Sequence, residues 1–237
     1  GAVPTVLSDI LHNRPDADLS SLRYIICGGS AVPQSLMEGY DETFGIEVVQ
    51  AWGMTETSPL GAIARVPKRS GDDPMQWRVK TGRVLPGVEI RICADDGVVL
   101  PWDGEAQGEI EIRGPWITGT YYLDPSDEKF HDGWLRTGDV GSIDTKGYIQ
   151  ISDRSEDVIK SGGEWISSVA LENTLMGHPG VREAAVVGVP DDRWDERPLA
   201  CVVLTVGATA TPDELSAYLA DKVAKWWLPE RWAFVDE

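Results

Sequence analysis

Apolar residues near the start of the chain follow the order strand, helix, strand. Residues 22–27 form a short apolar run closed by two glycines, as expected of a buried strand. A helix is predicted over residues 33–45 and a second strand over 46–51. Such a βαβ unit makes a parallel strand pair, so the loops after both strands lie at one edge of the sheet. In α/β sheets, that edge is where ligands bind.

The pattern changes in the middle of the chain. Residues 88–93, 108–113 and 147–152 alternate apolar and polar side chains, and turn signals separate them. This alternation is typical of strands with one buried face, as in antiparallel sheets. We therefore predict an antiparallel β subdomain in this part of the chain.

A third pattern occupies the remainder. A helix is predicted over 168–176 and strands over 181–189 and 199–206. Thr211 and Glu214 form a capping box for one more helix. The apolar stripe of that helix consists of Leu215, Tyr218, Leu219 and Val223. We therefore predict a small α+β domain at this end.

The three patterns together predict a multidomain chain of mixed α/β and α+β class. The βαβ unit and the antiparallel subdomain belong to one domain, residues 1–152, and the small domain is residues 153–237. A very polar stretch at 152–157 joins the two. The first residue is not Met, and both ends interrupt apolar segments, so we expect the chain to be a fragment of a longer protein.

Composition narrows the function classes. Hydrophobic residues make up 42% of the 237 residues, enough for a buried core, and 39 acidic against 21 basic residues give a net charge of −18. This acidity argues against nucleic acid as a partner. No apolar run approaches the roughly 20 residues of a membrane span. The three cysteines have neither metal-like spacing nor the number of a disulfide framework, so we expect a soluble, cytoplasmic protein.

The loop at 52–57 after the second strand is the first candidate site. Gly53 lets the backbone approach a ligand, and Thr55 can donate to an anionic oxygen. Glu56 can hold a hard cation such as Mg²⁺, and Trp52 offers a flat face for a base. The alternative for this loop is a simple exit from a strand that carries a solvated acid.

Two further segments are candidates. Asp139 follows a Thr-Gly turn in residues 134–139, where a carboxylate can accept two ribose hydroxyls or merely cap its own backbone. Lys160 precedes Ser161 and a pair of glycines that permit close backbone approach to a ligand. The alternative for these linker charges is that they are solvated.

Four motifs occur in an order that resembles one family. They are Trp-Gly-Met-Thr-Glu-Thr-Ser-Pro at 52–59, Gly-Glu-Ile-Glu-Ile-Arg-Gly-Pro with a following Gly-Thr-Tyr-Tyr within 108–122, Trp-Leu-Arg-Thr-Gly-Asp at 134–139, and the segment 147–167 ending in Lys-Ser-Gly-Gly-Glu-Trp-Ile-Ser. The chain resembles the adenylate-forming superfamily over essentially its whole length. The last motif is most similar to medium- and long-chain fatty acyl-CoA synthetases.

The resemblance implies roles for residues of the first domain. Trp52 matches the aromatic residue that stacks on adenine, Thr55 a phosphate contact and Glu56 the Mg²⁺ ligand. Asp139 matches the ribose-binding aspartate. The loop that lines the adenine and acyl pockets matches Gly29, Ser30 and Ala31.

Roles in the second domain follow in the same way. Arg154 matches an arginine that contacts the ribose region, and Glu156 falls at the hinge about which the small domain rotates between two half-reactions. The positions where the family contacts the adenylate or lines the pantetheine tunnel match Lys160, Gly162, Gly163 and Trp165.

The implied activity is that of an AMP-forming acyl-CoA synthetase. It uses ATP, Mg²⁺ and coenzyme A to convert a carboxylic acid, by resemblance a fatty acid, into its thioester through an acyl-adenylate. Residues 1–152 would then be the end of a large AMP-binding domain, and 153–237 most of a mobile C-terminal domain. The family's upstream phosphate loop and C-terminal Lys are not in this sequence, and we expect the chain alone to be inactive.

Two other functions stay open. One is a different adenylate former, such as a peptide-synthetase adenylation domain with a carrier protein as acceptor. The other is a non-catalytic nucleotide-binding module. The sequence does not fix the oligomeric state, and a homodimer stays open as well.

Overall fold

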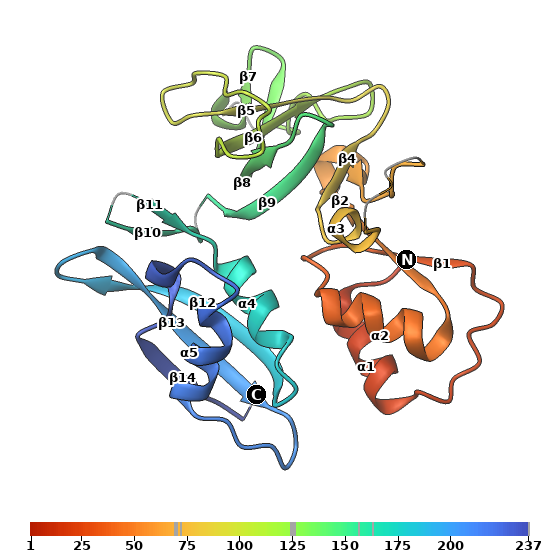
Figure 1. Cartoon of the computed structure of the whole chain (residues 1–237). Coiled ribbons are helices and arrows are strands. Elements are labelled where there is room, and N and C mark those ends of the chain that lie inside the picture. The colour runs from red at the N-terminus through yellow and green to blue at the C-terminus, as the bar shows by residue number, and fades with distance from the viewer. Residues whose placement is uncertain (69–70, 72, 124–126, 156, 163, 237) are drawn as a thin grey trace. The chain divides into compact units, whose positions relative to one another are not determined.

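The computed structural model divides the chain into two compact units, Gly1–Ile151 (unit 1) and Ser152–Glu237 (unit 2). It describes residues 1–68, 71, 73–123, 127–155, 157–162 and 164–236. Figure 1 shows the elements of both units.

In the described part of unit 1, α-helices and short 3₁₀ turns accompany the strands of one sheet. The helices and turns are α1 Pro4–Asn13, α2 Gln34–Phe44, α3 Met75–Arg78, η1 Thr55–Thr57 and η2 Asp127–Lys129. The strands are β1 Tyr24–Cys27, β2 Glu47–Trp52, β3 Ala62–Ile63, β4 Gly82–Val84, β5 Glu89–Cys93, β6 Gly108–Arg113, β7 Phe130–His131, β8 Trp134–Ile143 and β9 Tyr148–Arg154. Their order is β1-β2-β3-β4-β9-β8-β6-β5, with β7 beside β8. The boundary between the units lies within β9.

Unit 2, as far as the structure describes it, is a small sheet with helices α4 and α5. Its strands are β10 Ile159–Ser161, β11 Glu164–Ile166, β12 Val181–Asp191, β13 Asp195–Leu204 and β14 Arg231–Phe234. Its helices and turn are α4 Ser168–Met176, α5 Pro212–Ala220 and η3 Lys225–Trp227. The sheet order is β11-β10-β13-β12, and β14 pairs with β13 in parallel.

The predicted βαβ unit is confirmed. β1 and β2 are parallel, with Cys27 opposite Gln50, and α2 forms the connection between them. Gly45 ends α2 with a φ of 63°, the left-handed conformation that glycine adopts easily. The buried face of α2 packs beside α1, which Figure 1 shows next to it. Both loops after β1 and β2 therefore leave the sheet at the same edge.

The antiparallel subdomain is confirmed, with one correction. β5 and β6 pair antiparallel, as predicted, around a core of aliphatic residues. The Thr-Gly turn predicted within 134–139 is wrong, because these residues lie in β8, which pairs with β6. Gly138 keeps a φ of 75° inside this strand, beside an irregularity in the β6–β8 register. The glycine that signals a turn therefore marks a bulge.

Unit 2 follows the predicted α+β pattern. The helix over 168–176 has the predicted bounds, and the capping box of Thr211 and Glu214 is present. α5 ends at Ala220, so Val223 contacts the core from beyond the helix rather than from its stripe. Asp153 is the buried residue among those described in the polar stretch at 152–157, whereas Arg154, Ser155 and Asp157 are exposed. Asp153 is only 2% exposed, and its Oδ2 accepts a hydrogen bond from the Ser168 backbone N at 2.9 Å.

Glu172 in α4 makes unit 2 sensitive to pH. Its Oε1 accepts a hydrogen bond from the Val186 N at 2.8 Å. Burial raises the pKa of this carboxyl, and the nearby Asp153 and Asp157 raise it further. Folding thus favours the protonated form. The associated stability is fully present below the ordinary value of 4.5 and is lost as pH rises through the raised pKa.

We expect Glu172→Gln to raise the thermal unfolding midpoint at pH 8 by roughly 2–4 °C, about 0.5 kcal/mol in a small domain. The amide oxygen can still accept from the Val186 N, while the buried charge is gone. The difference should shrink toward pH 4.5, where wild-type Glu172 takes up its proton. Circular dichroism melts at several pH values measure this. The exposed Glu183→Gln in β12 is the control, and a difference that does not vary with pH would refute the argument.

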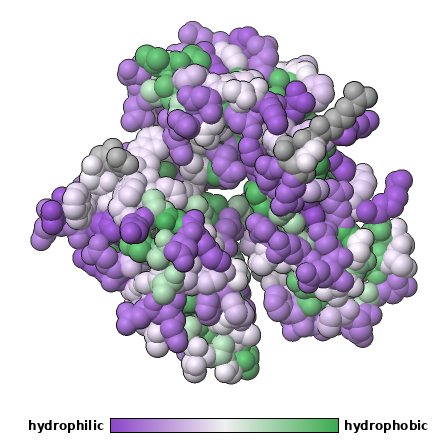
Figure 2. All heavy atoms as spheres, viewed as in Figure 1, coloured by the Kyte–Doolittle hydropathy of each residue, from purple (hydrophilic) through white to green (hydrophobic). Residues whose placement is uncertain are grey.

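The face of the molecule in Figure 2 is mostly polar, and the three cysteines form no disulfide. Figure 2 shows a mostly hydrophilic face with apolar residues in separate patches. Among the residues described here, no helix is long and apolar enough to cross a membrane. Cys27, Cys93 and Cys201 are unpaired thiols, and burial raises the pKa of Cys27 to about 11.

Candidate functional site

The loop after β2 is folded tightly on itself. A Cβ placed on Gly53 would lie 1.9 Å from the carbonyl oxygen of Pro59, so only glycine fits at this position. The hydroxyl of Thr57, which is fully buried, accepts from the Met54 N at 2.8 Å and donates to the Pro59 carbonyl at 2.8 Å. This leaves Thr55 exposed at the loop surface. Sequence reasoning gave Thr57 no role, although it stands in the quoted motif.

Glu56 is held in place rather than freely solvated. The phenol of Tyr121 donates to its Oε1 at 2.7 Å, and the Thr118 N donates to its backbone carbonyl at 2.8 Å. The ring of Tyr121 in turn packs edge-on against Phe130, with 5.3 Å between the ring centroids. The segment 118–121 therefore fixes the carboxylate. The Gly-Thr-Tyr-Tyr motif contained this partner, but the sequence did not indicate what Tyr121 contacts.

Trp52 and Asp139 meet although 87 positions separate them. The indole Nε1 of Trp52 donates to Oδ2 of Asp139 at 2.7 Å, and both side chains are buried. Asp139 is aligned through Thr137, whose hydroxyl donates to the Ile110 carbonyl at 2.8 Å and accepts from the Asp139 N at 3.1 Å. The Trp52 ring packs into the core of unit 1 against Gly61. The position of Asp139 is thus fixed by Trp52 from β2 and by Thr137 from its own strand, β8.

The loop after β1 is tied to β2 by a buried amide. Gln50 is 5% exposed, and its Oε1 accepts from the Val32 N at 2.6 Å while its Nε2 donates to the Lys80 carbonyl at 3.0 Å. These bonds set the course of residues 29–31, of which Gly29 and Ser30 are exposed and Ala31 is half-buried. Sequence reasoning missed Gln50. The available signal was a polar residue inside an apolar strand pattern, since buried amides need hydrogen-bond partners.

The remaining candidates lie in unit 2. Arg154 is exposed at the end of β9, and Lys160 is exposed on β10. β10 and β11 form a hairpin in which Lys160 pairs with Trp165, so these two side chains share one face. Gly162 turns the hairpin with a φ of 62°. Two predicted site residues, Glu156 and Gly163, lie outside the residues that the structure describes.

The candidate residues thus form two groups. Unit 1 brings Trp52 together with Asp139 and holds Glu56 in a loop that begins next to Trp52. Unit 2 carries Arg154 and the hairpin residues. Within the described ranges, no three His, Cys, Asp or Glu side chains form a group that could hold a metal ion by themselves. A fixed single carboxylate such as Glu56 suits Mg²⁺, which is commonly bound by one or two carboxylates together with substrate phosphates.

Two family models match most of the chain. Residues 1–122 match the model of the AMP-binding enzyme, and residues 170–237 match the model of the AMP-binding enzyme C-terminal domain. The chain is 45% identical to the long-chain-fatty-acid–CoA ligase of Thermus thermophilus and 42% identical to the 3-methylmercaptopropionyl-CoA ligase of Ruegeria pomeroyi. Both comparisons cover 99% of this chain, but only 45% and 44% of those relatives.

The fold agrees with solved structures. A crystal structure of an anthranilate CoA ligase in complex with anthranoyl-AMP superimposes with a TM-score of 0.87 at 29% identity. This match covers 99% of the chain and 45% of the solved one. The chain therefore spans less than half the length of the relatives it matches, and it belongs to the AMP-binding enzyme family.

Proposed function

We propose that this chain is part of an ATP-dependent acyl-CoA ligase that activates a carboxylic acid as its adenylate. The observation that carries the proposal is the hydrogen bond between Trp52 and Asp139, which joins two distant motifs beside the loop of Glu56. The named activities of the relatives support it, since both are CoA ligases. Those two relatives act on different acids by name. We further propose that the substrate acid is a fatty acid, on the basis of the motif at 160–167.

Unit 1 would bind the nucleotide. Trp52 donates to Oδ2 of Asp139, and because a carboxylate can accept several hydrogen bonds, the same group would also accept from the ribose hydroxyls. Thr55, exposed on the loop, would donate to a phosphate oxygen, and Gly53 would let the backbone approach it. Residues 29–31, fixed through Gln50, would line the adenine and acyl pockets. Trp52 is largely buried, so the face it offers to adenine is narrow.

The reaction needs charge neutralisation and positioning rather than a protein nucleophile. One oxygen of the substrate carboxylate attacks the α-phosphorus of ATP, the bond to pyrophosphate breaks, and an acyl-adenylate forms. Bound Mg²⁺ would neutralise the phosphate charge, with Glu56 as its protein ligand. Tyr121 keeps that carboxylate in one orientation, which avoids reorganisation during the reaction. The thiolate of coenzyme A then attacks the acyl carbon, and AMP leaves.

Unit 2 would serve the second half-reaction. Lys160 would contact the adenylate, Arg154 the ribose region, and Gly162 with Trp165 would line the path of the pantetheine arm. A rotation of residues 153–237 about Glu156 between the half-reactions is part of the same proposal. We also propose a cytoplasmic location, which the unpaired cysteines favour.

A pyrophosphate-release screen tests the proposal. The complete protein, meaning this chain with the further length that its relatives have, is incubated with ATP, Mg²⁺ and acids of graded chain length, with and without coenzyme A. Acid-dependent pyrophosphate release together with an acyl-CoA product is expected. Pyrophosphate release without a thioester would instead favour an adenylate former with another acceptor. Nucleotide binding without pyrophosphate release would favour a non-catalytic module.

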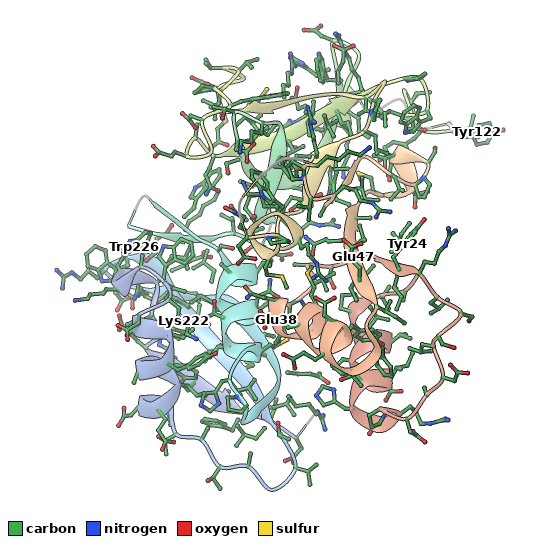
Figure 3. All side chains as sticks on the ribbon, turned by 45° about the vertical axis from the view of Figure 1, so that its right-hand side comes forward. Tyr24, Glu38, Glu47, Tyr122, Lys222 and Trp226 are labelled. Carbon is green, nitrogen blue, oxygen red and sulfur yellow. The ribbon has the colours of Figure 1, made fainter. Side chains whose placement is uncertain are left out.

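Tyr121→Phe should weaken the use of Mg²⁺ without disturbing the fold. The variant keeps the ring contact with Phe130 but removes the hydroxyl that holds Glu56. We expect the Mg²⁺ concentration for half-maximal pyrophosphate release to rise about three- to fivefold, less than the full value of a hydrogen bond to a charged group, because the charge of Glu56 remains. The neighbouring Tyr122→Phe is the control, because Tyr122 is 92% exposed and projects from the surface in Figure 3. Equal Mg²⁺ dependence in both variants would show that the Tyr121 hydroxyl does not position Glu56 for Mg²⁺.

A further inference from the structure

The β10–β11 hairpin is joined to its sheet by few backbone contacts. Among the hairpin residues that the structure describes, one residue pair joins it to β13, Ser161 with Asp195. The Gly162 N adds one hydrogen bond to the Trp194 carbonyl at 2.8 Å. Ile159 and Ile166 of the hairpin are buried in the core of unit 2, and two consecutive side chains of β13 add polar contacts. Glu196 Oε2 accepts from the Lys160 N at 2.9 Å, and Arg197 Nη1 donates to the Ser161 hydroxyl at 3.1 Å.

Arg197 also holds a second segment of unit 2. Its Nη1 donates to the Trp226 carbonyl at 2.8 Å, and its Nη2 donates to the Leu228 carbonyl at 3.3 Å and to Glu230 Oε1 at 3.1 Å. One guanidinium therefore connects the hairpin with residues 226–230, the segment that presents Trp226 at the surface in Figure 3. The planar guanidinium of arginine carries several N–H donors in a fixed geometry, so it can hold two segments at a defined distance. A lysine ammonium on its flexible stem fixes such a distance less well.

Burying the Arg197 guanidinium costs free energy, so these contacts are a poor source of stability. The Arg197 side chain is only 8% exposed, while Glu230, its charged partner in the ion pair, is 67% exposed. The Nε of Arg197 is buried without a hydrogen-bond partner among the described residues. A buried charge paired mainly with neutral carbonyls loses much of its hydration energy, and each unpaired buried donor adds to that loss. What the guanidinium does provide is one fixed spacing between the two segments.

We propose that Arg197 is a positioning residue for thioester formation. By fixing Ser161, it holds the neighbouring Lys160 and Gly162 and, across the hairpin, Trp165. The inference rests on the proposed function, in which these residues meet the adenylate and the pantetheine arm. In the proposed function, unit 1 supplies the nucleotide contacts for adenylate formation, and none of these contacts involves Arg197. Loss of the Arg197 contacts should therefore affect the use of coenzyme A more than the first half-reaction.

Steady-state kinetics of the complete enzyme test this inference. For Arg197→Met we expect the KM for coenzyme A to rise about tenfold, with pyrophosphate release in the absence of coenzyme A unchanged within about twofold. Arg197→Lys keeps the charge but not the planar guanidinium, and should give about a threefold rise. Ser161→Ala removes only the hairpin end of the contact and should also give about threefold. Arg231→Met is the matched control, since Arg231 belongs to the same unit and its side chain is 52% exposed.

Hydrogen exchange of the present chain gives a readout that does not depend on activity. In Arg197→Met, peptides covering 159–166 and 226–230 should lose protection together, whereas Ser161→Ala should affect the hairpin alone. An unchanged KM for coenzyme A in both variants, or an equal loss in both half-reactions, would overturn the inference. Ser161→Ala decides the matter if Arg197→Met does not fold. A wild-type enzyme that forms no thioester would instead contradict the proposed function, and the exchange data would distinguish the two failures.

Discussion

Replacing Glu56 with Gln is expected to reduce adenylate formation at least tenfold, about 1.4 kcal/mol of transition-state stabilisation. The substitution keeps the size of the side chain, and its amide oxygen can still accept from Tyr121. It removes the negative charge with which the proposed site holds Mg²⁺ beside the phosphates. The measurement is acid-dependent pyrophosphate release at saturating ATP, repeated across a Mg²⁺ titration.

Glu38→Gln serves as the matched control for this prediction. Glu38 is an exposed glutamate of α2, labelled in Figure 3, and the substitution makes the same change of charge in the same unit. The control should keep wild-type rates at every Mg²⁺ concentration. If Glu56→Gln also releases pyrophosphate at the wild-type rate, Glu56 is not the cation ligand.

Asp139→Ala should lower adenylate formation further, about 100-fold or 2.7 kcal/mol. The variant removes the carboxylate proposed to bind the ribose and leaves the buried indole N–H of Trp52 without this acceptor. Hydrogen bonds to charged groups contribute about 1.5–3 kcal/mol, and an orphaned buried donor carries a penalty of similar size. The KM for ATP and the rate of pyrophosphate release, measured together with thermal unfolding, report both effects.

Asp139→Asn separates binding from folding. The amide oxygen of Asn can replace Oδ2 as the acceptor for Trp52, so the unfolding midpoint should stay near that of the wild type. The charge that would receive the ribose hydroxyls is absent, so the KM for ATP should still rise about tenfold. Wild-type ATP kinetics in Asp139→Asn would show that the carboxylate acts through the indole alone.

Local signals in the sequence were sufficient for much of the fold. The helix over 168–176 has the predicted bounds because Ser167 caps its first turn, and helix caps are set by neighbouring residues. The capping box of α5 is equally local. The parallel β1–β2 pair followed from the order of the elements, since a strand–helix–strand connection leaves few alternatives.

Elements that depend on distant residues were not predicted. The segment of β8 was predicted as a turn because Thr137, Gly138 and Asp139 are turn formers, and its pairing with the neighbouring strands of the sheet makes it a strand. α1 begins at Pro4 and was not predicted, although Leu7, Ile10 and Leu11 have helical spacing, and its buried face packs beside α2.

For the candidate site too, the sequence indicated residues but not their contacts. Motifs identified Trp52, Glu56 and Asp139 as residues, but their hydrogen-bond partners come from other parts of the chain. Gln50 and Tyr121 carried no predicted role, because their contacts form only when the sheet and its loops assemble. Arg197 is an extreme case, since its partners in the hairpin and in residues 226–230 are about 30 or more positions away in the sequence.

Transfer of labelled oxygen tests the central claim most directly. The complete enzyme is given an acid labelled with ¹⁸O in both carboxylate oxygens, together with ATP and coenzyme A, and the AMP and pyrophosphate are analysed by mass spectrometry. If the carboxylate attacks the α-phosphorus and the thiolate then breaks the acyl C–O bond, each AMP receives one ¹⁸O atom and pyrophosphate receives none. Acyl-CoA formed with unlabelled AMP, or with the label in phosphate or pyrophosphate, would contradict the adenylate route.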